Sequence, residues 1–243
     1  MTSPRTWRDP NGVLVRLGWV ILAGLVGCDH QSLEVRDQDL RAVDTELQQF
    51  TRGPWADRFA SYAPDGSRMV FVSDRDGGSR LWIMLAVGEE ITPLTDAFEH
   101  LGFPVWSPDG KKIVYAANLP DGNIFSFKIF VMNADGSNQT QITNNPISSD
   151  TNPSWSPDGN QIVFSSTEEW GMNKIYVIDS NGANITLLTT DQNAIAENPS
   201  WSPDGTKISF SSDMGGQQYG INIYIMDSDG ANITRITTEE VEN

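Results

Sequence analysis

Cysteine, histidine and basic residues are scarce in this chain of 243 residues, and each shortage narrows what the protein can do. The single cysteine, Cys28, cannot form an intramolecular disulfide, and zinc sites need clustered His or Cys ligands. The two histidines are His30 and His100. A Ser-His-Asp triad would need His100, but no GxSxG nucleophile elbow occurs in the sequence. We therefore predict a protein that is not an enzyme and has no cofactor and no metal site.

Positive charge is the second shortage, because 16 basic residues face 32 acidic residues and the formal net charge is −16. Without residues 1–27, which hold three Arg and one Asp, 13 basic and 31 acidic residues remain and the net charge is −18. Such a surface repels phosphate backbones and anionic headgroups. We expect no nucleic acid partner, and membrane contact only through a lipid anchor.

Long apolar runs are also missing, apart from the 11 residues at 17–27. This run is too short to span a bilayer and fits the central region of a signal peptide. It ends in "LVGC" (25–28), which resembles the bacterial lipobox. We predict that residues 1–27 are a lipoprotein signal peptide, that Cys28 becomes the lipidated N-terminus, and that 28–45 is a tether. The alternative is a stray cysteine in an ordinary signal sequence.

The residue after the cysteine, Asp29, bears on which membrane holds the anchor. In enterobacteria an Asp at this position resembles the signal that keeps a lipoprotein in the inner membrane. An ordinary polar residue in a tether accounts for it equally well. We expect an extracytoplasmic, lipid-anchored protein on the periplasmic side of the inner or the outer membrane.

The remainder of the chain is repetitive, and the string "NPSWSPDG" occurs at both 152–159 and 198–205. Close variants stand at 103–110 and 59–66, so the turn prolines lie 44, 49 and 46 residues apart. This period is typical of one four-stranded propeller blade. Each repeat has four runs with strand composition, separated by turn residues; in the third repeat they are 152–156, 161–166, 174–179 and 184–189.

The repeat pattern "PxWSPDGxxIxFxS…IYxMDxDGxxxxxIT" resembles the TolB-type, WD-repeat-like β-propeller repeat. The resemblance implies an all-β propeller of four-stranded antiparallel blades, and it covers about 59–95, 103–143, 152–189 and 198–237. It also implies a non-catalytic scaffold of the bacterial envelope that binds other proteins. Similar blades gate prolyl-oligopeptidase-like serine peptidases, so the alternative is the propeller portion of a larger peptidase or multidomain envelope protein.

Loop lengths indicate where a partner would bind. The turn between the first and second strands and the spacing from the third-strand aromatic to the last Thr are constant in all four repeats. The loops between the second and third strands and between repeats vary, and in an up-and-down blade these share one face. Binding residues favour variable loops on a rigid scaffold. We expect an envelope protein or cell-wall partner to dock there, with candidate residues Phe125, Phe127, Trp170, Tyr219 and His100.

Residues that recur at one repeat position are better explained by structure than by binding. Trp106, Trp155, Trp201 and Tyr62 recur in the first strand, and we expect them to pack in the core or between blades. The three "NxT" sequons recur at the start of the fourth strand, so a structural cause is expected there too. The "DRDGG" (74–78) and "DSDG" (227–230) strings lack the downstream ligands of a calcium loop, which favours turn chemistry.

The two ends of the repeat region raise the question of closure. "ELQQFT" (46–51) matches the fourth strands of the repeats, so the propeller region, 46–243, opens with an unpaired fourth strand. The chain stops at Asn243, where a fifth repeat would begin. The sequence therefore predicts a truncated propeller, an open arc of four blades with exposed edges.

The lipidation hypothesis is testable by replacing the only thiol in the chain. Because the diacylglycerol is attached to sulfur, Cys28→Ser should release the protein from the membrane fraction or leave it unprocessed. Fractionation and the mass of the N-terminal peptide measure this. Unchanged processing and membrane partitioning of the variant would rule out Cys28 as the anchor.

Overall fold

A computed structural model describes residues 49–96, 100–118, 126–167, 171–215 and 220–237. The chain divides into two units, 1–47 and 48–243, and every described residue belongs to the second. All regular secondary structure of these residues is β-strand. Cys28 and the predicted tether lie outside the described residues.

Sixteen strands form four antiparallel sheets, each built from four strands that follow one another in the sequence. We call these sheets blades 1 to 4. Blade 1 contains β1 (Asp57–Tyr62), β2 (Arg68–Ser73), β3 (Arg80–Leu85) and β4 (Thr92–Pro93). Blade 2 contains β5 (Leu101–Trp106), β6 (Lys112–Asn118), β7 (Phe127–Asn133) and β8 (Thr140–Gln141). Blade 3 contains β9 (Ser149–Trp155), β10 (Gln161–Thr167), β11 (Asn173–Asp179) and β12 (Thr186–Leu187). Blade 4 contains β13 (Ala196–Trp201), β14 (Lys207–Ser212), β15 (Asn222–Asp227) and β16 (Thr234–Arg235).

The predicted all-β class and the four-stranded antiparallel blades are confirmed, but the fourth strands are much shorter than the sequence indicates. In blade 3 the ladder between β11 and β12 pairs only Thr186 and Leu187. Asn184 precedes it at a φ of 53°, in the left-handed region. After the strand, Thr189 uses its Oγ1 to accept a hydrogen bond from the main-chain N–H of Ile175. A side chain thus replaces the backbone acceptor and ends the ladder.

The same threonine contact occurs in every blade, with N···Oγ1 distances of 2.9 to 3.1 Å. This bond explains why the spacing from the third-strand aromatic to this threonine is constant, since the residue just before the aromatic donates the hydrogen bond to the threonine. The four threonines are Thr95, Thr143, Thr189 and Thr237.

The "NP" of the repeated octapeptide marks a bulge in the first strand of a blade. Asn152 and Asn198 have φ values of 53° and 55°, and the ladder shifts register beside each of them. Asn tolerates the left-handed region better than most residues do. The sequon residues Asn138, Asn184 and Asn232 share this conformation, so the expected structural cause of the sequons is present.

The "SPDG" segment is a hydrogen-bonded turn, shown here for blade 3. Ser156 Oγ donates to Asp158 Oδ1 at 2.6 Å and accepts from the N–H of Gln161 at 2.9 Å. Asp158 Oδ1 also accepts from the N–H of Asn160, and Gly159 takes the positive φ, 72°, that reverses the chain. Equivalent contacts are made in the turns that begin at Ser107 and Ser202.

Neighbouring blades contact each other mainly through the first strand of the later blade, and the glycine turns add a close approach. A Cβ atom on Gly136, between β7 and β8, would lie 2.5 Å from the carbonyl oxygen of Leu94 in blade 1. Gly230 stands in the same relation to Leu188 of blade 3, at 2.9 Å. Glycine is therefore required at these turns both for its positive φ and for the close approach of the preceding blade.

The first-strand aromatics pack as expected in three of four blades. Trp106 and Trp155 are buried, and Trp155 Nε1 donates to the carbonyl oxygen of Val105 in the preceding blade at 3.1 Å. Trp201 is half-buried. The expectation is wrong for Tyr62, which is 55% exposed, because no described blade covers that side of β1.

The expected strand at 46–51 is not formed by the residues that the structure describes there, 49–51. Phe50 nevertheless lies against Gly88 of blade 1, as Leu94 lies against Gly136 in the next blade. It packs on the cluster that contains Phe71 and Trp82. The segment thus takes the place of a preceding fourth strand but makes no ladder, since no described third strand lies beside it.

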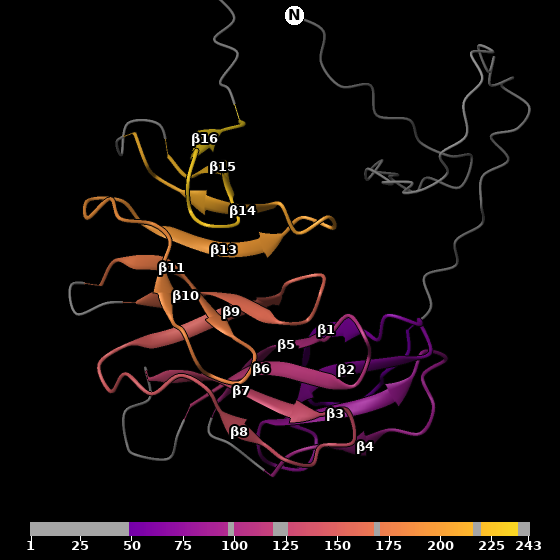
Figure 1. The fold of residues 1–243 in the computed structure, drawn as a ribbon. Coiled ribbons are helices and arrows are strands. Elements are labelled where there is room, and N and C mark those ends of the chain that lie inside the picture. Colours follow the sequence, from indigo (N-terminus) through magenta and orange to yellow (C-terminus); the bar gives the residue numbers. More distant parts are fainter. Residues whose placement is uncertain (1–48, 97–99, 119–125, 168–170, 216–219, 238–243) are drawn as a thin grey trace, which may run out of the picture. The chain divides into compact units, whose positions relative to one another are not determined.

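The blades form an open array in which blade 4 contacts blade 3 (Figure 1). In blade 3 the third-strand residues Ile175 and Val177 are buried by blade 4. The counterpart of Ile175 in blade 4, Ile223, is exposed, and so is Ile236, the counterpart of the buried Leu188. This face of blade 4 is therefore an uncovered inter-blade surface among the described residues.

The glycine contact between blades predicts the outcome of a simple substitution. Gly136→Ala adds a Cβ that must displace the Leu94 carbonyl, which should cost about 1–3 kcal/mol beyond the strain of a positive φ. Urea unfolding of the purified protein measures this loss.

Gly66→Ala is the matched control, because Gly66 also has a positive φ, 70°, but no atom lies within 4 Å of its added Cβ. Equal destabilisation by the two substitutions would show that the close approach between blades 1 and 2 does not contribute to the loss of stability in Gly136→Ala.

Candidate functional site

Consecutive antiparallel strands place two kinds of connection at the same end of the blades. We call this end the loop face. Between second and third strands it comprises the segments 74–79, 126, 171–172, 213–215 and 220–221. Between blades it comprises 96, 100, 144–148 and 190–195. The segments are tied together there, since Asp74 Oδ1 accepts from Ala56 N–H and Asp213 Oδ1 accepts from Ile195 N–H. The opposite end, the turn face, carries the glycine turns.

The predicted binding residues fall mostly outside the part of the chain that the structure describes. Phe125, Trp170 and Tyr219 are not described, so their role stays a prediction. His100 is exposed on the loop face, and its ring centroid lies 6.5 Å from that of Phe127. Phe127 is half-buried and packs against the core between blades 2 and 3, so it is partly a structural residue.

A pocket of about 500 Å³ lies between blades 2 and 3, beside the loop 144–148. Its walls include Ile142, Tyr176 and Ile178, and exposed Ile147 and Ile185 also line it. This volume lies in the range of small-ligand pockets.

The charged side chain among the residues that line this pocket is a buried carboxylate. Asp150, which is 2% exposed, accepts a hydrogen bond of 2.6 Å from Ser166 Oγ. Sequence reasoning missed both residues. The available signal was that an Asp opens the first strand opposite a Ser of the second strand in two repeats, at Asp57 and Ser73 as well as here.

Two buried lysines hold the loops between blades, and the sequence analysis missed these as well. Lys128 Nζ donates to the carbonyl oxygen of Ser148, which lines the pocket. Lys174 Nζ donates to the carbonyl oxygens of Asp191 and Ala194 in the next loop. Both occupy the position two residues before the third-strand aromatic, and their ammonium groups hold the carbonyls of the loop that leads to the next blade.

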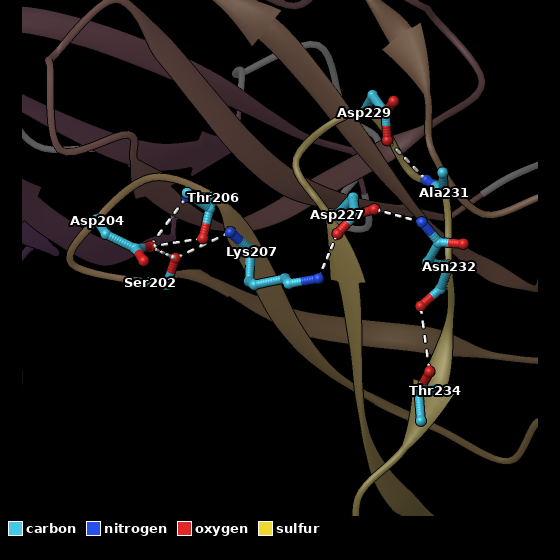
Figure 2. Close-up of polar contacts among 9 residues, drawn as sticks. All are labelled: Ser202, Asp204, Thr206, Lys207, Asp227, Asp229, Ala231, Asn232 and Thr234. Atoms are coloured by element: carbon cyan, nitrogen blue, oxygen red, sulfur yellow. Dashed lines mark hydrogen bonds and ion pairs between the residues drawn. The ribbon is translucent and has the colours of Figure 1, made fainter.

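The aspartates of the glycine turns make hydrogen bonds within their own turns, as Figure 2 shows for blade 4. Asp227 accepts from Lys207 and Asn232, and Asp229 Oδ1 accepts from the N–H of Ala231 at 2.9 Å. The "DSDG" string is thus explained by turn chemistry. Among the described residues no group of three His, Cys, Asp or Glu side chains could hold a metal ion.

Hydrogen bonds to these turn carboxylates shift their pKa values. The Ser202 hydroxyl, followed by the main-chain N–H and the hydroxyl of Thr206, lowers the pKa of Asp204 from 3.8 to about 2 (Figure 2). The pKa values of Asp109 and Asp158 are lowered by the same kinds of bonds. The folded state therefore favours the ionised form of the aspartate carboxyl in each of these turns.

Comparison with known proteins agrees with this architecture. Residues 95–189 match the TolB beta propeller domain family. The blades are TolB-like propeller blades. Two solved structures share the fold: a putative TolB from Agrobacterium tumefaciens, at 24% identity and a TM-score of 0.62, and TolB from Acinetobacter baumannii, at 20% and 0.64. The matches cover 72% and 79% of this chain and 63% and 47% of those chains.

A peptidase is also among the relatives of the TolB-like chain. The uncharacterized peptidase YuxL of Bacillus subtilis (strain 168) is 40% identical over 62 residues, which are 25% of this chain and 9% of that protein. The chain thus spans less than two thirds of the length of each protein compared. Across the described residues, no helix has the length and apolar character needed to cross a membrane.

The serine of the turn motif can be tested through the pKa of its aspartate. Ser202→Ala removes the main donor to Asp204, so the pKa of this carboxyl should rise from about 2 toward 3.8. A lowered pKa stabilises the folded state at pH values above 3.8, and this contribution is lost as the pH falls through about 2. The destabilisation by Ser202→Ala, measured by urea unfolding, should therefore be largest near neutral pH and shrink below pH 3.8.

NMR titration of the side-chain carboxyl gives the pKa directly. Ser228→Ala is the control, since the Ser228 side chain makes no described contact to Asp204. An unchanged Asp204 pKa in Ser202→Ala would contradict the role given to the hydroxyl.

Proposed function

We propose that this chain is a non-catalytic, lipid-anchored binding scaffold of the bacterial cell envelope, and that a protein partner docks on the loop face. The pocket beside the loop 144–148 carries this proposal, because it combines a buried acceptor with apolar walls and reaches the end of the blades where loop lengths vary. The lipobox-like segment before Cys28 and the TolB-like fold support the envelope location.

The turn face is less suited to recognition. Its depressions are lined by turn residues such as Ser107, Asp109 and Asp158, whose polar atoms already bond within their own turns. A partner that docked there would have to compete with these bonds. The loop face instead presents His100 and Ile147, neither of which is required by its own turn.

A binding role also fits the chemistry of the described histidine. A hydrolytic site needs a base within hydrogen-bond reach of a nucleophile. His100 instead lies beside the aromatic ring of Phe127, and no described Ser or Asp side chain bonds to it. A partner with an aromatic or apolar contact surface would suit this pair.

The second candidate function is that of the propeller portion of a larger serine peptidase, and the match to YuxL favours it. In that case the blades would control access to a hydrolase domain. The DNA beyond codon 243 distinguishes the two functions, since an α/β-hydrolase domain in the same reading frame would support the peptidase.

Capture of the partner from its own envelope tests the proposed face. We expect His100→Ala combined with Ile147→Ala, in the full chain extracted with detergent, to lower the recovered crosslinked partner about tenfold, since central contacts carry most of the binding free energy. Mass spectrometry of the captured material measures the loss.

Lys111→Ala combined with Val87→Ala is the matched control. Val87 is as exposed as Ile147, at 63% against 61%, and both control residues lie on the turn face. If the control pair abolished capture and the first pair did not, the partner would bind the turn face and the proposal would be wrong.

A further inference from the structure

Asp150, the acid in the pocket, has a counterpart in blade 1, Asp57, which forms an ion pair with an arginine of its own blade. In blade 1, Asp57 pairs with Ser73 across β1 and β2, as Asp150 pairs with Ser166 across β9 and β10. There the carboxylate Oδ1 lies 3.0 Å from an Nη2 of Arg75, a residue of the loop that follows β2. The two sites therefore share an acid and a hydroxyl, but only one of them contains a guanidinium.

Arg75 is held on an aromatic surface as well as by the acid. Its guanidinium carbon lies 5.0 Å from the ring centroid of Phe71 and 4.9 Å from that of Trp82. Its Nε donates to Ser73 Oγ at 3.0 Å. This geometry combines ion pairing with stacking on aromatic faces, which is the mode of recognition that suits arginine.

The aromatic surface is also present in blade 3. Phe164 and Tyr176 pair across β10 and β11, as Phe71 and Trp82 pair across β2 and β3. Ile142 lines the pocket where Phe50 covers the cluster of blade 1. The pocket thus repeats the acid, the hydroxyl and the aromatic pair of the Arg75 site, but it has Ser148 where blade 1 has Trp55, whose ring lies 5.4 Å from the Arg75 guanidinium carbon.

The other two blades lack both charges at this position. In blade 4 the acid is replaced by Ala196, and Met214, two residues after the paired Ser212, packs into the core. In blade 2 the pair is Leu101 and Ala117. The cation therefore accompanies the acid in blade 1, and an apolar residue accompanies alanine in blade 4.

Blade 3 has the acid but lacks the arginine that follows the second strand in blade 1. Its buried Lys174, which lies opposite Ser166 across β10 and β11, donates instead to the carbonyl oxygens of Asp191 and Ala194. The residue two positions after Ser166 in the sequence is Glu168, where blade 1 has Arg75. Among the described residues no Lys or Arg forms an ion pair with Asp150. A carboxylate that is 2% exposed and opens into a 500 Å³ pocket is left with capacity for a cationic donor.

We propose that this pocket binds the guanidinium of an arginine side chain presented by the protein partner, in the way that blade 1 binds its own Arg75. The proposal rests on the proposed function and specifies its chemistry. The guanidinium would donate to the Asp150 carboxylate and lie over Tyr176. The exposed Ile147 and Ile185 would contact the aliphatic stem and its neighbours.

The net charge of −16 favours the same ligand, because an acidic surface attracts a cationic segment and speeds its association. Arginine suits the site better than lysine does. A planar guanidinium can bond to the carboxylate and stack on an aromatic ring at the same time, whereas an ammonium is a compact point charge.

Binding of N-acetyl-arginine methylamide to the purified full chain in detergent tests the proposal. NMR titration should give a Kd on the order of 1 mM, as expected for so small a ligand, with amide shifts at Ser148, Asp150 and Ser166. The citrulline analogue, which has nearly the same shape but no charge, should bind at least about tenfold more weakly, and the lysine analogue should also be weaker.

Asp150→Asn should weaken arginine binding at least about tenfold, and Glu89→Gln, which removes the same charge from an exposed turn, should leave it unchanged. Equal binding of arginine and citrulline, shifts confined to residues outside the pocket, or no binding would overturn the proposal even if Asp150→Asn failed to fold.

The test separates this inference from the proposed function. If the arginine ligand fails to bind but the Ile147 variant still loses envelope capture, the loop face binds its partner without an arginine. If the ligand binds but capture depends on the turn face, the pocket is real and the proposed docking face is wrong.

Discussion

One hydrogen bond recurs at the end of every blade, and the loop face depends on it. The hydroxyl of Thr95, Thr143, Thr189 or Thr237 accepts from the N–H of the second or third residue of the third strand and replaces the backbone carbonyl that a longer fourth strand would supply. Because the ladder ends there, the chain is free to leave the sheet and cross to the next blade. In blades 2 and 3 a buried lysine of the third strand then binds the carbonyls of this crossing segment. The variable loops are thus fixed at their base.

The interfaces between blades follow from a second constraint, which is that each blade must fit both of its neighbours. Glycine turns let a blade approach the fourth strand of the one before it, and aromatic pairs such as Phe164 and Tyr176 fill the space between second and third strands. At Asp150 an acid stands where blades 2 and 4 have Leu101 and Ala196, and a pocket remains between the blades. The candidate site is therefore a local departure from the repeat rather than an added element.

Much of the fold could be predicted from the sequence, because the residues that each turn and strand needs recur in four repeats. Prolines, glycines and aspartates define the turns, and the constant threonine spacing reflects a real bond. The exposure of Tyr62 could not be predicted, since it depends on which blade lies beside β1. The Asp150 site was missed because its acid occurs in only two of four repeats. In the equivalent site of blade 1, the cation Arg75 also lies 18 residues from Asp57 in the sequence.

The open array of blades has a consequence for the order in which the blades unfold. In a linear stack each blade is stabilised only by its nearest neighbours, so opening free energies should differ along the chain. Among the described residues, blades 2 and 3 each contact two other blades, whereas blade 4 contacts one and leaves Ile223 and Ile236 exposed. Blade 1 is partly compensated, because Phe50 and Arg75 cover its free side. Local unfolding should therefore begin at blade 4 and reach the interface that contains the pocket last. The pocket should stay formed while blade 4 unfolds.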